Sequence, residues 1–284
     1  MHRSVVITGA NGFVGRNVGM FLSKNGFQTT SLVRKGKAVN FGKKITSETL
    51  SENSLVPKIR NADALLHFIG QGKQTVDSDY EKVNVGIARN TVSLCKKAKI
   101  KKIIYISGLG VDKFATLGYF ISKYKAEQEI IHSGLDYTIL RASYMIGNDD
   151  PLSENLQRQV KKGEIVIPGS GNYRFQPIFI DDVSRIIIKS VTEKKFSKKI
   201  IDLVGPQIVS YNAFVKEFSR GKVRMKKIDF ERAYRDALHD KGSFGVDDLS
   251  IMVGDYVGNH KKLADLTRMK FTRYETVLKS RGLS

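Results

Sequence analysis

Three glycines near the start of the chain have a spacing that can bind a diphosphate. Gly9, Gly12 and Gly15 directly follow the β-branched apolar run 4–8. Glycine permits a sharp turn at the first position, close approach of phosphate at the second and tight helix packing at the third. The amides at the N-terminus of the following helix then attract negative charge. The pattern predicts a strand, a turn and a helix that hold a dinucleotide pyrophosphate, against the alternative of a strand–turn–helix whose glycines serve packing alone.

Other residues complete the predicted nucleotide site. The next positions of the turn and helix belong to it, namely Asn11, Phe13 and Val14. We also assign to it Ile69 and Gly70, at the end of the strand that we expect over 64–69.

The end of the second strand decides which dinucleotide we expect. In sheets of this kind a carboxylate there binds the free 2′-hydroxyl of the adenosine ribose, whereas an arginine accepts a 2′-phosphate. Here the strand ends in Ser31-Leu32-Val33 and is followed by Arg34 and Lys35, with no acid. The sequence therefore favours NADP(H) over NAD(H), and the alternative is that both residues are ordinary loop cations.

Apolar runs alternate with helical periods through the first half of the chain. We expect strands at 4–8, 28–33, 64–69, 102–107 and 137–141, with a weaker one at 43–46. This alternation predicts an α/β fold of right-handed βαβ units, a doubly wound parallel sheet of Rossmann type.

The alternation loosens after residue 147. We expect residues 1–147 to form the NAD(P)-binding domain. Residues 148–284 then form a smaller C-terminal α/β substrate lobe, packed on the first part and partly interleaved with it.

The chain carries a large excess of positive charge. Its 48 Lys and Arg residues against 28 Asp and Glu give a net charge of +20. The basic clusters are spread along the chain without interleaved aromatic residues, which favours a solvated basic surface and argues against nucleic acid as a partner. An anionic substrate, an anionic membrane surface, nucleic acid or a larger complex remains an alternative.

The composition also limits where the protein is expected in the cell and which chemistry it can carry out. No stretch reaches the roughly 18 apolar residues of a membrane span. The first strand begins too early to leave room for a signal peptide, so we expect a cytoplasmic protein, as a monomer or homodimer. A single cysteine excludes an intrachain disulfide, and the histidines have no metal-ligand spacing.

Further motifs carry a family resemblance that covers nearly the whole chain. The sequence resembles the extended and atypical short-chain dehydrogenase/reductases, a group that includes NAD-dependent epimerases and dehydratases, and especially the branch like the NADPH-binding accessory subunit of respiratory complex I. Besides the glycines, the resemblance rests on the segments Asn61-Ala62-Asp63-Ala64-Leu65-Leu66-His67, Asn84-Val85-Gly86, Ile106-Ser107-Gly108-Leu109-Gly110, Tyr119-x-x-x-Lys123, Leu140-Arg141-Ala142-Ser143 and Gln176-Pro177-Ile178-Phe179-Ile180-Asp181-Asp182-Val183.

The resemblance implies a catalytic pair. Tyr119 matches the family tyrosine that exchanges a proton with the substrate, and Lys123 matches the lysine one helical turn later, which also reaches the nicotinamide ribose. Because a free phenol has a pKa of about 10, such a tyrosine needs a nearby ammonium and an oxidised nicotinamide to act as a base. The alternative is a surface tyrosine beside a surface lysine.

The resemblance also assigns roles to three further residues. Ser107 is the candidate for the serine that holds the substrate oxygen, but it lies earlier than usual, because Gly108-Leu109-Gly110 follows it. Glu48 falls where the family has an acid for the adenine amino group. We expect Asn84 to be a buried residue that bonds the backbone.

The expected substrate residues follow a strand end or lie in the C-terminal lobe, and they are Arg141, Tyr144, Met145 and Arg174. Arg174 suits either a substrate phosphate or a structural ion pair. These residues imply an NADP(H)-dependent oxidoreductase, epimerase or dehydratase acting on a small, anionic molecule such as a nucleotide sugar, or on an isoprenoid-like carbonyl. The alternative is a non-catalytic NADP(H)-binding redox sensor or a structural subunit of a larger complex.

Overall fold

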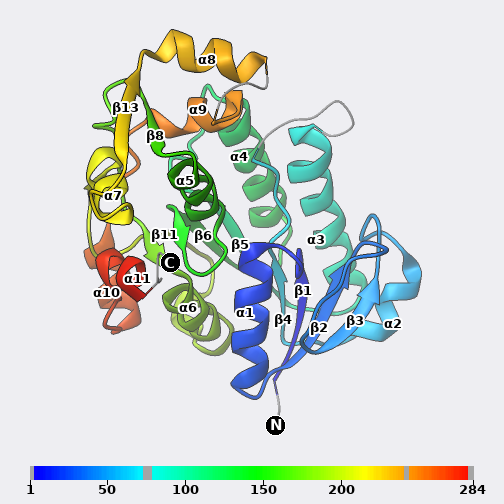
Figure 1. The fold of residues 1–284 in the computed structure, drawn as a ribbon. Coiled ribbons are helices and arrows are strands. Elements are labelled where there is room, and N and C mark those ends of the chain that lie inside the picture. The colour runs from blue at the N-terminus through cyan, green and yellow to red at the C-terminus, as the bar shows by residue number, and fades with distance from the viewer. Residues whose placement is uncertain (1–2, 73–78, 240–242, 281–284) are drawn as a thin grey trace.

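A parallel sheet forms the centre of the molecule (Figure 1). The computed structural model describes residues 3–72, 79–239 and 243–280. Within these residues, seven strands pair in the order β11-β6-β5-β4-β1-β2-β3, all parallel. From β1 the chain adds β2 and β3 on one side of the sheet, and then β4, β5 and β6 on the other side. A doubly wound sheet opens its ligand crevice at this point, between β1 and β4. The expected doubly wound α/β fold is confirmed.

The first six strands of this sheet along the chain follow the predicted apolar runs, and the seventh, at 199–203, was not predicted. They are β1 (Ser4–Thr8), β2 (Gln28–Val33), β3 (Lys43–Thr46), β4 (Ala64–His67), β5 (Lys102–Gly108), β6 (Asp136–Ala142) and β11 (Lys199–Leu203). β4 ends two residues earlier than predicted. The chain then leaves the sheet toward the glycine turn, and the Phe68 amide donates to the Thr8 carbonyl oxygen at 3.3 Å.

Helices cover both faces of the sheet, because successive strand residues point to opposite sides. On one face, Val5 and Ile7 pack in a core with α1 (Phe13–Lys24), α6 (Ile180–Thr192) and α10 (His260–Thr267). On the other face, Val6 packs in a core with α2 (Val56–Ile59), α3 (Ile87–Lys97) and α4 (Gly118–Ile131). Three short helical segments flank these helices. The segment η1 (Asn53–Leu55) precedes α2, the π-helix η2 (Glu81–Gly86) precedes α3, and η3 (Lys194–Phe196) follows α6.

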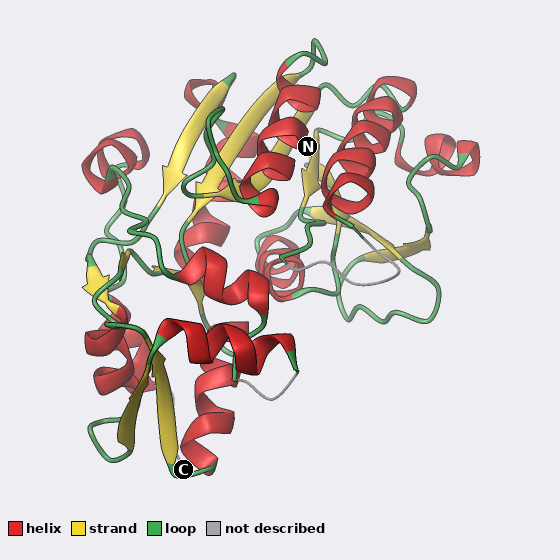
Figure 2. Cartoon of the chain, turned by 90° about the horizontal axis from the view of Figure 1, so that it is seen from above, coloured by secondary structure: helices red, strands yellow, loops and turns green. Residues whose placement is uncertain are grey.

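A smaller lobe with its own core lies beyond one end of the sheet (Figure 2). Its strands form two-stranded pairs, β10 with β7, β12 with β9 and β13 with β8. The remaining elements are β7 (Met145–Ile146), α5 (Pro151–Lys161), β8 (Glu164–Pro168), β9 (Arg174–Phe175), β10 (Ile178–Phe179), β12 (Val209–Ser210), α7 (Tyr211–Phe218), β13 (Arg224–Ile228), α8 (Phe230–Leu238), α9 (Val246–Met252) and α11 (Tyr274–Ser280).

The chain crosses between the two parts more than once. After the first lobe segment it returns to the main sheet, where α6 packs beside α1 and β11 pairs with β6. No helix in the described ranges is long and apolar enough to cross a membrane.

Candidate nucleotide and catalytic site

The glycine turn between β1 and α1 leaves no room for a side chain at two of its three glycines, Gly9 and Gly15. Gly9 has φ +69°, and a Cβ atom there would lie 2.8 Å from the Phe68 carbonyl carbon. A Cβ atom on Gly15 would overlap the Gly9 carbonyl oxygen and lie 2.7 Å from the Ala10 Cα atom. The Gly12 amide closes the turn by donating to the Gly9 oxygen at 3.0 Å. The backbone path therefore requires glycine at positions 9 and 15, whereas a Cβ atom on Gly12 would meet only the Gly9 oxygen, at 3.4 Å.

The N-terminus of α1 suits an anion. The helix begins at Phe13 after Gly12, no side chain caps it, and its first turn carries no acid. Its first backbone amides therefore lack a side-chain acceptor, which is the arrangement that binds a diphosphate. Asn11, Val14 and the loop residue Ile69 are partly buried around this turn. The cradle fits a dinucleotide, whose pyrophosphate the amides after Gly12 would hold.

The end of β2 presents charged side chains beside this cradle. Arg34 and Lys35 are exposed, as is Glu48 from the loop after β3. The Lys35 amide donates to Glu48 Oε1 at 2.8 Å. The loop after β2 and the loop after β3, which were both predicted to contact the adenosine, are therefore in contact with each other. Glu52 Oε1 accepts the Glu48 amide at 2.8 Å and helps to fix this loop.

Tyr119 and Lys123 extend from α4 to the carboxyl end of β5. Lys123 Nζ donates to the Tyr105 hydroxyl and to the Ile106 carbonyl oxygen, each at 3.0 Å. A Cβ atom on Gly108 would lie 3.3 Å from the Tyr119 hydroxyl, and one on Gly70 would lie 3.0 Å from Lys123 Nζ. The predicted pair and the predicted cofactor residue Gly70 thus lie at the same edge of the sheet.

Burial sets the protonation of this pair. It raises the pKa of Tyr119 to about 12 and lowers the pKa of Lys123 to about 8, the latter against the pull of the Glu127 carboxylate. At neutral pH the phenol holds its proton and the ammonium is charged. The Tyr119 hydroxyl is therefore protonated, and it is a weaker acid than a free phenol.

Two buried aromatic residues support Lys123 and were missed from the sequence. Tyr105 also lies under the Lys123 ammonium, 4.6 Å from its ring centroid, and stacks on His67 at 5.4 Å between ring centroids. Burial and the Lys123 charge lower the pKa of His67 to about 3, so its ring is neutral. Thr8 Oγ1 lies 2.8 Å from His67 Nδ1. The one sequence signal was a tyrosine within the otherwise aliphatic β5 run.

Ser107 and Asn84 lie beside the same helix. Ser107 is buried, and its hydroxyl has no hydrogen-bond partner among the described residues. Asn84 is buried, accepts the Gln71 amide at 2.8 Å and donates to the Ser122 hydroxyl at 2.9 Å. The prediction that Asn84 bonds the backbone is confirmed, and through Ser122 it also ties the loop after β4 to α4.

The two arginines expected near the substrate are held by carboxylates. Arg141 donates to both oxygens of the buried Glu127, at 3.0 and 2.6 Å. Arg174 donates twice to Asp255 Oδ2, at 2.8 and 2.7 Å, so it forms the structural ion pair. Tyr144 and Arg174 line one pocket in the C-terminal lobe, and Arg141 is not among its lining residues. Met145 is partly buried in β7.

A family model described as NAD(P)H-binding matches residues 9–193, more than half of the chain. The chain belongs to this NAD(P)H-binding family. Its motifs and fold are those of the extended short-chain dehydrogenase/reductases.

Two similar proteins carry the names of different kinds of protein, a respiratory-chain subunit and a reductase. "NADH dehydrogenase [ubiquinone] 1 alpha subcomplex subunit 9, mitochondrial" of Arabidopsis thaliana is 26% identical over 71% of this chain and 54% of its own length. The chain thus spans about half the length of that relative. "Phenylcoumaran benzylic ether reductase IRL1" of Ginkgo biloba is 26% identical over 74% of this chain and 72% of its own length.

A solved structure shares the whole fold of this NAD(P)H-binding protein. UDP-glucuronic acid 4-epimerase from Bacillus cereus, in complex with UDP-glucuronic acid and NAD, superposes with a TM-score of 0.76 at 17% identity. The superposition covers 97% of this chain and 96% of the epimerase. Among the described residues, no group of three or more acidic, histidine or cysteine side chains could hold a metal ion.

Proposed function

We propose that the chain is an NADP(H)-dependent oxidoreductase acting on a carbonyl or alcohol of a small molecule. The observation that carries this proposal is the convergence of the Tyr119 hydroxyl and the Lys123 ammonium on the carboxyl end of β5, beside Gly70. The uncapped α1 N-terminus supports dinucleotide binding at the same edge. The family match supports NAD(P)H as the cofactor class.

The residues divide the work between binding and proton transfer. The amides after Gly12 hold the pyrophosphate, and a bound nicotinamide supplies or accepts the hydride. Tyr119 donates its proton to the substrate oxygen in the reducing direction and takes it back in the oxidising direction. The Lys123 ammonium favours the phenolate that remains, and Tyr105 holds the ammonium in place.

Replacing Tyr119 by Phe removes the proton donor while keeping the ring. We expect turnover to fall by about 100-fold or more, the usual contribution of a positioned acid or base. NADPH affinity should stay within about twofold, because the phenol does not touch the phosphate cradle. Tyr124→Phe, one residue beyond Lys123 on the same helix, is the control. Equal turnover in Tyr119→Phe and the wild type would remove Tyr119 from the mechanism.

The preference for NADP(H) rests on Arg34 and Lys35, which are exposed after β2. We expect Arg34→Ala to weaken NADPH binding about 10- to 100-fold, the size of a lost charge-assisted hydrogen-bond pair, with NADH affinity almost unchanged. Lys37 is an exposed cation in the same loop, and Lys37→Ala should change neither the NADPH affinity nor the NADH affinity. Titration of each variant with NADPH and with NADH measures both affinities. If Arg34→Ala lowers the two affinities equally, Arg34 does not contact the 2′-phosphate.

A non-catalytic role as a subunit of a larger complex is the second candidate. Two observations favour it: Leu109 stands where a catalytic serine would follow β5, and one relative is a complex I subunit. Purification of the native protein in a stable assembly, with slow exchange of its bound dinucleotide, would support this candidate. Isolation as a free monomer or dimer with rapid exchange would count against it.

A further inference from the structure

Many of the basic residues that are spread along the sequence gather on one edge of the folded sheet. The strands of the main sheet are parallel, so their amino ends lie together at one edge, at the bottom of Figure 1. Five turns that lead from a helix into a strand cross this edge, beside the residues that open β1. We call the surface that they form the amino-edge surface, and its segments are 3–4, 24–28, 58–63, 96–102, 132–136 and 189–199.

Hydrogen bonds between these segments show that the surface is continuous. The Asp136 amide donates to the Lys101 carbonyl oxygen at 2.9 Å, and the Asp136 carboxylate accepts the Lys198 amide at 3.2 Å. The Arg3 guanidinium donates to the Val191 carbonyl oxygen at 3.3 Å. Because β2 and β4 pair with β1 on either side, the turns before them lie beside Arg3.

The amino-edge surface carries more than half of the net charge of the chain. Its 36 residues include 14 Lys and Arg residues against three Asp and Glu residues, a net charge of +11 out of +20. Two of the three carboxylates are already paired, Asp136 with Lys102, and Glu193 with Lys189 and Lys195. Within the described chain the other 11 cations of the surface form no ion pair, and each of them is exposed.

Helix capping accounts for only some of these cations. A lysine in the last turn of a helix interacts favourably with the helix dipole, and the last-turn lysines of α1, α2 and α3 fit that role. Lys101, Lys198 and Lys199 lie instead at the start of β5 and β11, where no helix ends. Unpaired like charges repel one another, which disfavours the compact state. The amino-edge surface therefore suits an extended anionic partner.

The composition of the surface favours a lipid membrane over a nucleic acid. Lysine makes up 12 of its 14 cations, whereas arginine is the residue that pairs bidentately with phosphates and base edges. Its two aromatic residues, Phe27 and Phe196, are not exposed, so no ring is available for bases to stack on. The helices present their C-termini here, not the N-termini whose amides bind nucleic-acid phosphates.

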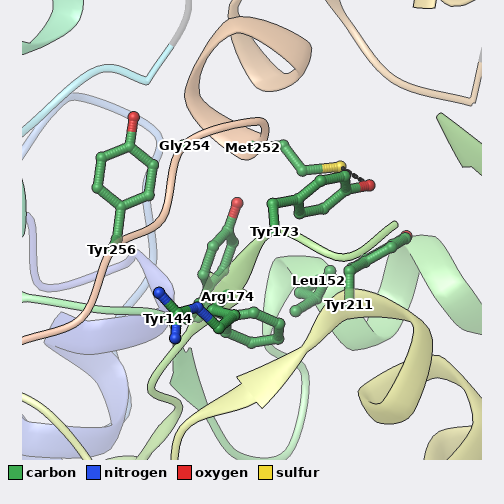
Figure 3. Close-up of a pocket in the computed structure, with 9 residues that line it drawn as sticks. Tyr144, Leu152, Tyr173, Arg174, Tyr211, Met252, Gly254 and Tyr256 are labelled. Carbon is green, nitrogen blue, oxygen red and sulfur yellow. Dashed lines mark hydrogen bonds between the residues drawn. The ribbon is translucent and has the colours of Figure 1, made fainter. Parts of the chain in front are cut away.

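We propose that the amino-edge surface docks this protein on an anionic lipid membrane. The inference does not depend on the proposed oxidoreductase function. Tyr144, drawn with its neighbours in Figure 3, follows the carboxyl end of β6, at the opposite edge of the sheet. The glycine turn follows the carboxyl end of β1. Docking through the amino edge therefore leaves the nucleotide site and the C-terminal lobe directed away from the membrane.

The test measures co-sedimentation of the full chain with lipid vesicles. Vesicles of phosphatidylcholine with about 30% phosphatidylserine are the probe, and vesicles of phosphatidylcholine alone are the comparison. At about 0.1 M KCl we expect the anionic vesicles to bind at least about 10-fold more tightly than the neutral ones. Raising the salt to about 1 M shortens the Debye length from about 10 Å to about 3 Å and should abolish binding.

A fourfold variant removes exposed cations from the amino-edge surface, by Lys96→Gln, Lys101→Gln, Lys194→Gln and Lys199→Gln. We expect it to bind anionic vesicles at least about 30-fold more weakly, because each lysine close to such a membrane contributes about 5-fold. Its NADPH affinity should equal that of the wild type, because these residues lie at the opposite edge from the glycine turn.

The matched control removes the same charge from exposed positions of the C-terminal lobe, by Lys161→Gln, Lys162→Gln, Lys216→Gln and Lys222→Gln. Charges more than a Debye length from the membrane are screened, so this variant should bind vesicles within about threefold of the wild type. Equal weakening in the two variants would assign binding to the overall charge of the chain and overturn the inference.

Two further results also contradict membrane docking. One is a wild-type chain that does not bind anionic vesicles. The other is a mixed-sequence DNA duplex that, at equal phosphate concentration, binds more tightly than the vesicles and is lost only in the amino-edge variant, which assigns the surface to nucleic acid. Either result leaves the oxidoreductase proposal standing, since that proposal is tested by NADPH binding and by turnover.

Discussion

We expect Gly15→Ala to weaken dinucleotide binding strongly. The added methyl group overlaps the Gly9 carbonyl oxygen and lies 2.7 Å from the Ala10 Cα atom, both of them rigid backbone. The helix can accommodate it only by moving away from β1, which displaces the amides of the first turn from the phosphate. Overpacking of this kind costs about 1–3 kcal/mol of stability, and we expect at least a roughly 100-fold loss of NADPH affinity.

Gly86→Ala is the control for this substitution. Gly86 is also helical, with φ −61°, but its added Cβ would make an ordinary contact of 3.6 Å with the Glu81 carbonyl oxygen. Calorimetric titration with NADPH and thermal unfolding should show it close to the wild type. If Gly15→Ala binds NADPH as well as Gly86→Ala does, the crossover does not hold the diphosphate.

We expect Glu127→Ala to lower the free energy of unfolding by about 3–5 kcal/mol, because it leaves the Arg141 guanidinium partly buried and unpaired. The Glu127 side chain is fully buried, and Arg141 is 23% exposed. The same substitution removes the carboxylate that supports the charge of Lys123, so the pKa of Lys123 should fall further below its usual value. Denaturant unfolding measures the first effect.

Glu129→Ala on the same helix is the matched control. Glu129 pairs with Arg89 at 2.7 Å, but the two side chains are 31% and 61% exposed. An exposed pair contributes less than about 1 kcal/mol, so this variant should unfold almost like the wild type. Similar losses in Glu127→Ala and Glu129→Ala would mean that the Arg141 pair is not a buried ion pair in solution.

The sequence predicted those features that depend on local spacing. The glycine turn needs residues without side chains at 9 and 15, and the strands β1 to β6 are short apolar runs, so both could be read from neighbouring residues, whereas β11 could not. The helical spacing of Tyr119 and Lys123 likewise put both on one face of α4.

Contacts between distant segments could not be predicted in this way. Arg174 meets Asp255, which lies 81 residues further along the chain, so spacing could not choose between a phosphate and an ion pair. The support of Lys123 by Tyr105 depends on how α4 packs over β5. The pocket in the C-terminal lobe combines residues from 144 to 256, and only the folded lobe brings them together.

Calorimetric titration of the wild-type chain with NADPH, followed by NADH, tests the diphosphate site most directly. The uncapped α1 N-terminus and the glycine cradle predict saturable binding of one dinucleotide per chain, with NADPH the tighter of the two. Absence of heat and of competition with both dinucleotides at millimolar concentration would contradict a nucleotide site in this crossover.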